Sequence, residues 1–396
     1  MSPFPRHRVR PARKHPALRV VVISLATVLV AALTGGFFVY RHLEDNIVAV
    51  DVEEALGDVR RPKVFAPKTT TDVEVEHDPL NILLLGSDTR EGQGNDTIGG
   101  ETPGLSDTTI LLHLSADRDR AYGVSIPRDA MVERPACDRK DGQGVDPGGL
   151  AMFNAAYAIG GPACTIKTLE KISRIRINHF VVVDFNGFKA MVDALDGVPV
   201  CVPREVNDDI GKIYMRAGSY EVKGQEALDY VRLRHELSEN GDIGRMKRQQ
   251  TFLAAMANKA VSAGTLANPI RLYRFLDAAT SSLTTDTELA DLQKLASLGS
   301  ELKGIGLDKI QFLTVPFETY PPDPNRLQIA PEAEALWKRL KHDEPLTRSQ
   351  SESVTTAAGN PDGKPSKGPS SSPRGNETKA EAAERLETAE ANGLCT

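Results

Sequence analysis

The sequence predicts an α/β protein, a sandwich of helices on a central sheet, which follows a single transmembrane helix. Three observations support this. Between residues 79 and 342, short apolar runs bounded by Gly, Asp or Pro alternate with longer segments of helical pattern, as in α/β folds. Residues 20–40 contain no charged side chain. Residues 343–396 are rich in Ser, Pro, Gly, Lys and Glu, a composition typical of disordered segments.

The N-terminal 40 residues have the pattern of a membrane anchor. Residues 1–19 carry six Lys or Arg side chains and no acid. The uncharged run 20–40 is about 30 Å long as a helix, which matches the hydrocarbon core of a bilayer. The basic flank predicts a cytoplasmic N-terminus and an extracellular remainder. The alternative is a cleaved signal peptide, but its apolar region is usually shorter, about 7–15 residues.

Composition divides the rest of the chain into three parts. Residues 41–78 are mixed and charged with little apolar periodicity, and we expect a stalk there. Residues 79–342 are long enough to bury one large core. Residues 343–396 have few large apolar side chains to offset their ordering entropy, and we expect a disordered tail.

The elements of the central part are predicted from apolar runs and helical periodicity. The expected strands are 80–88, 108–115, 120–127, 179–185, 198–203 and 309–317. The expected helices are 150–160, 162–175, 186–198, 224–231, 243–263, 267–282, 287–302 and 331–341.

Acidic and basic side chains stand at the ends of the first three strands. Asp88 and Arg90 follow the first strand, Asp107 precedes the second, and Arg128 follows the third behind Pro127. Strand ends at the crevice of an α/β sheet commonly face ligands, and two carboxylates there can hold one hard cation. The structural alternatives are a loop-capping Asp and a surface Arg–Asp pair of small energetic value.

The densest polar cluster lies around the start of a helix. Arg232 and Arg234 are two residues apart, so both side chains share one face if the segment is extended. Asp242 stands at a helix N-cap position, and Arg245 and Gln249 follow on the first turns. A basic helix start beside paired arginines suits phosphate or pyrophosphate. A solvated helix start is the alternative, and the Gln249 amide can equally bind core backbone.

Several functions are excluded by what the sequence lacks. The formal net charge of −6 argues against a nucleic-acid partner, because phosphates need a basic field. No Cys-x-x-Cys pair or His cluster offers a zinc site, and the sequence has no phosphate-binding Gly-rich loop ending in Lys, no Gly-x-Ser-x-Gly elbow and no His-Glu-x-x-His.

Taken together, six motifs resemble the LytR–CpsA–Psr family of cell-wall proteins in type and order. They are NILLLGSDTR, SDTTILLHLS, SIPRDAMV, FNAAYAIGGPACTIKTLE, HFVVVDFNGFKAMVDALDGVPV and ALDYVRLRH…GDIGRMKRQQ. The resemblance covers residues 79–262 in detail and extends in fold to about 340. The GGPACTIKTLE form and the long tail are similar to actinobacterial members. The loop between Asp88 and Asp107 is longer than is usual in the family.

The resemblance implies an α/β/α sandwich with a central mixed sheet and an apolar pocket for a polyprenyl tail. It implies transfer of a glycopolymer, such as a teichoic acid, from polyprenyl pyrophosphate to the 6-hydroxyl of N-acetylmuramic acid in peptidoglycan, through a phosphodiester. By motif, Asp88 and Asp107 would hold Mg²⁺ or Mn²⁺. The pyrophosphate would be bound by arginines and an amide, namely Arg90, Arg128, Arg232, Arg234, Arg245 and Gln249.

The same resemblance gives the catalytic roles to Arg128, Asp242 and Arg245, with Asp242 or Asp88 as the candidate general base. Phosphoryl transfer depends on charge neutralisation and in-line positioning, which a cation and several arginines supply. Two other functions fit the same residues: a pyrophosphatase acting on polyprenyl pyrophosphates, and a non-catalytic lipid-carrier binding or regulatory module.

The cysteines predict one disulfide. Thiols oxidise outside the membrane, and Cys137 and Cys164 flank a Gly- and Asp-rich loop beside the proposed site. Their pairing would close a loop and contribute about 2–4 kcal/mol to stability. Cys201 lies in an apolar strand, where a buried thiol is expected, and Cys395 lies in the tail.

Overall fold

The computed structural model describes residues 16–57, 61–63, 77–87, 104–234, 237, 242–351, 354–356 and 387. The chain divides into two compact units between Asp45 and Asn46. The first contains helix α1 (Pro16–Asp45), of which Val20–Asp45 is long and apolar enough to cross a bilayer, with a mean hydropathy of 2.3. This agrees with the predicted span.

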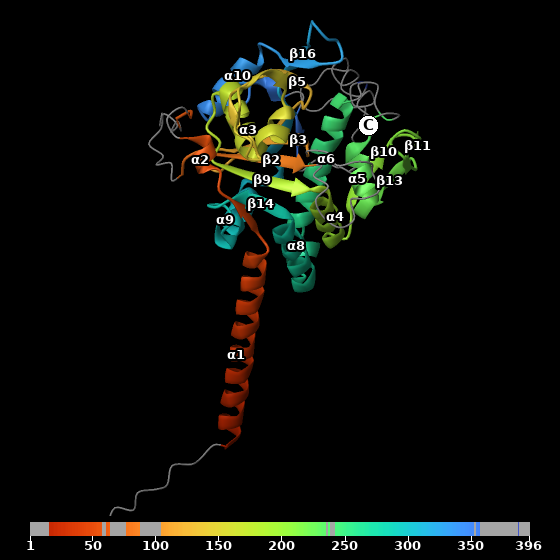
Figure 1. Ribbon diagram of the computed structural model, residues 1–396. Coiled ribbons are helices and arrows are strands. Elements are labelled where there is room, and N and C mark those ends of the chain that lie inside the picture. The colour runs from red at the N-terminus through yellow and green to blue at the C-terminus, as the bar shows by residue number, and fades with distance from the viewer. Residues whose placement is uncertain are drawn as a thin grey trace, which may run out of the picture. The chain divides into compact units, whose positions relative to one another are not determined.

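The second unit is built on an eight-stranded mixed sheet (Figure 1). Its strands lie in the order β1 (Val48–Val50), β14 (Leu283–Asp286), β9 (His179–Asp184), β2 (Leu80–Ser87), β3 (Ser106–Leu114), β4 (Ala121–Ile126), β15 (Ile310–Thr314) and β18 (Thr355–Thr356). The pairs β1–β14, β9–β2 and β4–β15 are parallel, and the other neighbours are antiparallel. The predicted mixed sheet is confirmed.

Helices cover both faces of this sheet, because successive strand residues point to opposite sides. On one face, Leu83 and Phe180 pack with α3 (Ala155–Ser173) and α10 (Ala333–Lys341), and Trp337 is 4% exposed there. On the other face, Ile82 and Leu112 pack with α6 (Asp242–Val261) and α9 (Leu292–Ile305). Figure 1 shows α3 and α10 above the sheet and α9 below it. This is the expected α/β/α sandwich.

A second apolar core lies beside the sheet and was not predicted. It joins four short strands, β10 (Val198–Val202), β11 (Val206–Asp208), β12 (Ile213–Met215) and β13 (Gly218–Val222), to three helices, α4 (Phe185–Ala194), α5 (Gly224–Arg232) and α6. Because β10 pairs with β13, the run 198–203 does not enter the central sheet. The second core holds α5 and α6 together, and both helices contribute to the site.

The predictions of a stalk at residues 41–78 and of a helix at residues 150–160 were wrong in part. The described first part of the predicted stalk belongs to the domain, since β1 pairs with β14 and α2 (Glu53–Leu56) packs into the main core. The buried Arg61 guanidinium also binds Glu170 on α3, with 2.9 Å between Nη2 and Oε1. The expected helix at 150–160 begins as a strand, β8 (Gly149–Met152), which pairs with β5 (Ala130–Arg134).

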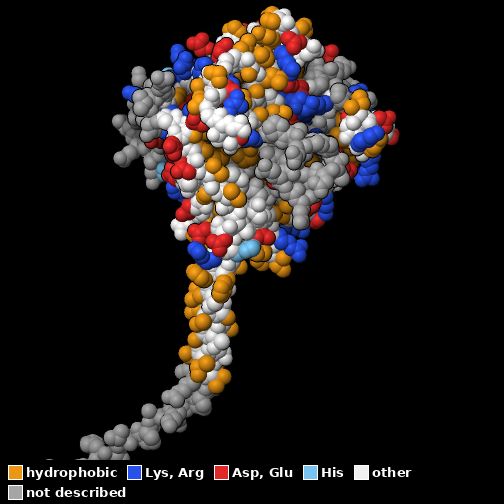
Figure 2. Space-filling view, viewed as in Figure 1, with side chains coloured by type: hydrophobic (Ala, Val, Ile, Leu, Met, Phe, Trp, Pro, Cys, Tyr) orange, Lys and Arg blue, Asp and Glu red, His pale blue; other side chains and the backbone are white. Residues whose placement is uncertain are grey.

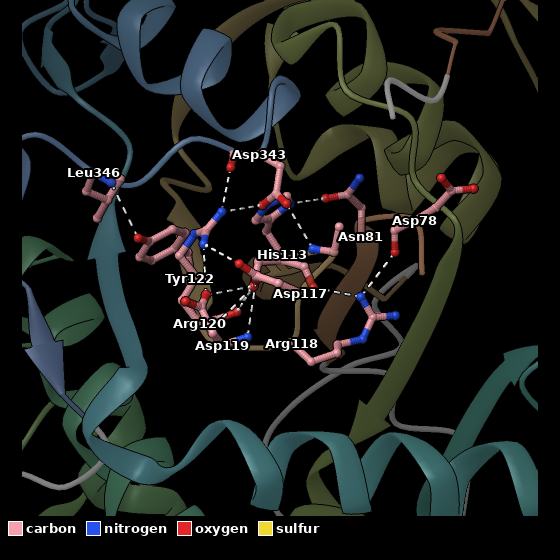
Figure 3. A network of polar contacts seen from close by, with 12 residues as sticks. Asp78, Asn81, His113, Asp117, Arg118, Asp119, Arg120, Tyr122, Asp343 and Leu346 are labelled. Carbon is pink, nitrogen blue, oxygen red and sulfur yellow. Dashed lines mark hydrogen bonds and ion pairs between the residues drawn. The ribbon is translucent and has the colours of Figure 1, made fainter. Parts of the chain in front are cut away.

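The expected start of the disordered tail was also wrong. Asp343 is buried and accepts hydrogen bonds from Ala116 N (2.9 Å) and Arg120 Nη2 (3.0 Å) (Figure 3). His113 lies between Asp343 and Asn81, with Nε2 3.2 Å from Asp343 Oδ1 and Nδ1 2.8 Å from Asn81 Oδ1. Beyond this network, α11 (Arg348–Ser351) and β18 continue the fold. Residues 357–386 and 388–396 lie outside the described residues.

The predicted disulfide is present. Cys137 on β6 (Cys137–Asp138) bonds to Cys164 on α3, with Cα atoms 5.5 Å apart. Both cysteines are 1% exposed, so the bond fixes β6 against the helix inside a small core. Cys201 is disulfide-bonded as well, so the expected buried thiol was wrong, and its partner lies outside the described residues.

Candidate active site

The candidate site lies at one edge of the central sheet, where β2, β4, β9 and β15 end and β3 begins. This edge is common to those strands because they run parallel to one another and antiparallel to β3. Asp107 is the second residue of β3. Asp88 and Arg90 lie outside the described residues.

Arg128 is the central basic residue of this edge. Pro127 follows β4 and fixes the direction in which the chain leaves the strand. The guanidinium of Arg128 then contacts three carboxylates, with Nη1 2.5 Å from Asp107 Oδ1, and Nε 3.3 Å from Asp129 Oδ2 and 3.6 Å from Asp242 Oδ2. Its side chain is only 14% exposed, so these contacts are poorly screened by water.

The first turn of α6 completes the arrangement. Arg245 Nη2 lies 2.8 Å from Asp242 Oδ2, and Arg245 Nη1 lies 4.0 Å from Asp107 Oδ1. Arg234 follows α5 and reaches the same two carboxylates. Its Nη2 lies 3.8 Å from Asp107 Oδ1, and its Nε lies 3.8 Å from Asp242 Oδ1. Asp242 was expected at the N-cap position, but it is the first residue of the helix. We call Asp107, Arg128, Arg234, Asp242 and Arg245 the arginine–aspartate cluster.

The five residues of the cluster carry three positive and two negative charges, and Asp129, which also contacts Arg128, adds a third negative charge. Burial opposes ionisation of Asp107, but Arg128, Arg245 and Arg234 outweigh it, and the pKa of Asp107 lies below its ordinary value. Burial also lowers the pKa of Arg245, and the neighbouring Arg128 and Arg234 add to this against the attraction of Asp242. A guanidinium surrounded in this way would be stabilised by an anion. The cluster therefore suits a phosphate ligand.

Two buried guanidinium nitrogens of the cluster make no hydrogen bond of good geometry within the described part of the chain. They are the Nε atoms of Arg128 and Arg245, although Arg128 Nε lies 3.3 Å from Asp129 Oδ2 and 3.6 Å from Asp242 Oδ2. Buried polar atoms without a hydrogen bond are uncommon in native proteins because each costs about 1–3 kcal/mol, and a bound ion or ligand is one way to satisfy them.

Of the two carboxylates predicted to hold a divalent cation, the structure describes only Asp107. The three arginine contacts to Asp107 all end on Oδ1, which leaves Oδ2 to accept a further ligand. Among the residues that the structure describes, no three His, Cys, Asp or Glu side chains lie close enough to share a metal. A cation on Asp107 would therefore depend on Asp88 or on substrate phosphates, which is the way Mg²⁺ is commonly held.

Two predicted residues have other partners. Arg232 is the last residue of α5, so the extended segment expected there was wrong, and its guanidinium lies over the Phe185 ring at 4.9 Å. The amide nitrogen of Gln249 donates to the backbone oxygen of Val231 at 3.1 Å. The alternative that this amide binds core backbone is therefore the one that the structure shows. Both contacts hold α5 against its neighbours, α4 and α6.

Gln250 is a positioning residue that sequence reasoning missed. It is fully buried, and its Nε2 donates to Ser125 Oγ (2.8 Å) and Thr314 Oγ1 (3.0 Å). These bonds join α6 to the ends of β4 and β15 and so set the distance from Arg245 to Arg128. The sequence signal was a second glutamine directly after Gln249, in the helix that carries Met246, Phe252 and Ala254 on its buried side.

We expect the two arginines near the end of α5 to differ on substitution. Arg234→Ala should reduce the thermal stabilisation by pyrophosphate and lower about 10²-fold the transfer that the family resemblance implies, because Arg234 contacts Asp107 and Asp242. Arg232→Ala should mainly lower the Tm, because it removes the Phe185 contact. Transfer assays and thermal shifts with and without pyrophosphate distinguish the two. Full transfer and an unchanged ligand shift in Arg234→Ala would place the phosphate elsewhere.

Comparisons with known proteins point to one family. A sequence model of the LytR_cpsA_psr family matches residues 40–342. The chain is 34% identical over 230 residues to the probable cell wall biosynthesis protein LcpB of Corynebacterium glutamicum, covering 57% of this chain and 52% of that protein. It is 29% identical over 279 residues to polyisoprenyl-teichoic acid–peptidoglycan teichoic acid transferase TagU of Bacillus cereus, covering 70% and 83%.

A solved structure agrees in fold. The crystal structure of TagV from B. subtilis matches with a TM-score of 0.51 at 27% identity, covering 68% of this chain and 98% of that one. The chain spans about half the length of its Corynebacterium relative.

Proposed function

Because the chain belongs to the LytR–CpsA–Psr family, we propose that it transfers a glycopolymer from a polyprenyl-pyrophosphate carrier to the N-acetylmuramic acid 6-hydroxyl of peptidoglycan. The observation that carries this proposal is the arginine–aspartate cluster at the sheet edge, where three guanidinium groups from separate segments converge on the carboxylates of Asp107 and Asp242. The names of the relatives support the same substrate class, since TagU is a teichoic acid transferase.

The reaction forms one phosphorus–oxygen bond and breaks another. The muramic acid hydroxyl oxygen attacks the phosphorus that carries the glycopolymer, and polyprenyl phosphate leaves with the electrons of the broken bond. Arg128, Arg234 and Arg245 bind the phosphate oxygens and offset the charge that develops on them. The hydroxyl proton passes to a carboxylate at this edge, for which Asp242 and Asp88 are the candidates. Arg90, which lies outside the described residues, is a further candidate for the pyrophosphate, whereas Arg232 lies over the Phe185 ring.

A divalent cation, Mg²⁺ or Mn²⁺, would be held by Asp107 through Oδ2 together with Asp88. When bound, it neutralises phosphate charge as a Lewis acid. Asp107 already contacts the arginines through Oδ1, so this one carboxylate would orient both the guanidinium groups and the divalent cation.

The polyprenyl tail needs an apolar surface next to the cluster. The sheet face under α6 and α9 offers half-buried apolar side chains at Leu84, Val183, Leu253, Leu283, Leu295 and Leu298. Burying an isoprenoid chain against them would be favourable by about 25 cal/mol per Å² of apolar area.

Product analysis with a lipid-linked substrate tests this function. Incubation with Mg²⁺ and peptidoglycan fragments should give a phosphodiester-linked polymer, and omission of the fragments should give no release of polyprenyl phosphate. Release of polyprenyl phosphate without acceptor would identify a pyrophosphatase. Binding of the lipid with no product under either condition would identify a carrier-binding protein.

We also propose that α1 is an uncleaved anchor with its N-terminus in the cytoplasm and the catalytic domain outside. The basic residues before the span support this orientation. A C-terminal tag should then be removed by protease added to intact protoplasts. Recovery of a shortened, soluble chain from the medium would contradict the anchor.

A further inference from the structure

We propose that the exposed face of helix α8 (Pro269–Ser282) lies on the membrane, at the boundary between the headgroups and the acyl chains of the bilayer that holds α1. The inference rests on α1 spanning that bilayer. It assigns a lipid-binding surface to the catalytic domain itself, separate from the anchor and from the arginine–aspartate cluster.

The first observation is that α8 exposes large apolar side chains on its outer side. Ile270 is 66% exposed, Tyr273 37% and Leu276 36%. The opposite side of α8 is occupied, because Phe275 packs against the second core. Figure 2 shows hydrophobic and basic side chains together at the lower end of the domain, where Figure 1 places α8. Contiguous exposed apolar side chains of this kind mark interaction surfaces.

The second observation is where the chain enters the domain. Asn46, the residue directly after α1, donates through Nδ2 to Asp277 Oδ1 (3.0 Å) and Thr280 Oγ1 (3.3 Å). Asp277 and Thr280 follow Tyr273 by four and seven residues, so all three lie on one side of α8. The pairing of β1 with β14, which directly follows α8, holds this contact in place. The chain therefore enters the domain on the side of α8 that exposes Tyr273.

Covalent geometry limits how far this face can lie from the bilayer. Only residues 41–45 separate the uncharged run from Asn46, and five helical residues span about 7.5 Å. The headgroup region of each leaflet is about 5–7 Å thick. Ile270 lies seven residues from Asp277, about 10 Å along the helix. The side chains of α8 are thus within reach of the headgroups and the outer acyl chains.

Charge favours a lipid surface over another occupant. Arg274 is exposed beside the apolar residues and forms no ion pair with any residue that the structure describes. Arg271 is half-buried on the same helix, and its Nη2 lies 3.7 Å from Asp196 Oδ2. Apolar side chains flanked by arginines are the composition of interfacial helices, which bury their apolar side about 5–10 Å deep and attract anionic lipids.

Tryptophan quenching in proteoliposomes tests the proposal on the full chain. The chain has one tryptophan, Trp337, which is 4% exposed in the core and gives a constant background. In bilayers of phosphatidylcholine and phosphatidylglycerol with brominated acyl chains, Ile270→Trp should lose about half of its added emission, because a side chain at the expected depth contacts the bromines.

Ile210→Trp is the matched control, since Ile210 is 85% exposed between β11 and β12, away from α8 in Figure 1. Its added emission should not be quenched. Equal quenching of both variants, or none in Ile270→Trp, would overturn the proposal, as would a chain that does not float with the vesicles. A concentration-dependent blue shift of Ile270→Trp in detergent would instead assign the face to a second copy. None of these readouts depends on transfer activity.

Discussion

Replacing Arg128 by alanine should lower glycopolymer transfer per folded molecule by about 10²–10³-fold, because one group that neutralises developing charge is removed from a water-poor site. Arg128 is the residue that contacts three carboxylates, those of Asp107, Asp129 and Asp242. Its pKa is raised because these carboxylates outweigh the effect of burial, so it remains charged at any pH of interest. Arg128→Lys should recover little, since an ammonium cannot reproduce the planar geometry.

Arg326→Ala is the matched control for this experiment. Arg326 lies 3.5 Å from the same Asp129 and 36% of its side chain is exposed, but it has no contact with the arginine–aspartate cluster among the described residues. Its loss should leave transfer near the wild-type rate. The measurement is initial transfer rate divided by the folded fraction from circular dichroism. A rate for Arg128→Ala close to that of Arg326→Ala would remove Arg128 from the catalytic machinery.

The position of Arg128 was predictable because the signal was local. An apolar run that ends in Pro is a strand end, and a residue held there faces the ligand edge of an α/β sheet. Asp107 was predictable for the same reason. Asp242 and Arg245 followed from a helix start, although the exact first residue of the helix was one off.

The errors came from contacts that are distant in sequence. Val48–Val50 is too short to predict as a strand, and only its partner β14, over 230 residues later, makes it one. Asp343 looked like the start of a polar tail, but it is buried by His113 and Arg120. Arg232 was assigned to an extended segment because nothing local shows that α5 continues to it.

Replacing Asp107 by asparagine should strengthen the binding of metal-free pyrophosphate and abolish the additional effect of Mg²⁺. Asp107 fixes Arg128, Arg234 and Arg245 through one oxygen. Without its charge, the three guanidinium groups should bind free pyrophosphate more tightly, and pyrophosphate without metal should raise the Tm more than in wild type. The additional shift that Mg²⁺ gives in wild type should be lost, and transfer should fall by about 10²-fold or more.

The pH dependence of stability provides a second readout of the same substitution. Because the folded-state pKa of Asp107 lies below its ordinary value, its stabilising effect is present above its unfolded pKa and is lost as the pH falls through the folded value. Asp107→Asn should therefore be less stable than wild type at pH 7, by an amount on the order of 3 kcal/mol. The difference should narrow toward low pH, where the wild-type carboxyl becomes protonated.

Asp117→Asn is the control, because Asp117 lies just beyond the other end of β3 and pairs only with Arg120 among the described residues, at 3.3 Å. It should keep the wild-type response to both pyrophosphate and Mg²⁺. The measurement is a thermal shift with pyrophosphate alone, Mg²⁺ alone and both together, beside a transfer assay. If Asp107→Asn kept the full Mg²⁺-dependent shift while losing stability, Asp107 would be only a structural counter-ion for the arginines. In that case Asp107 Oδ2 would not be a ligand of the cation, and the cation would bind through other groups.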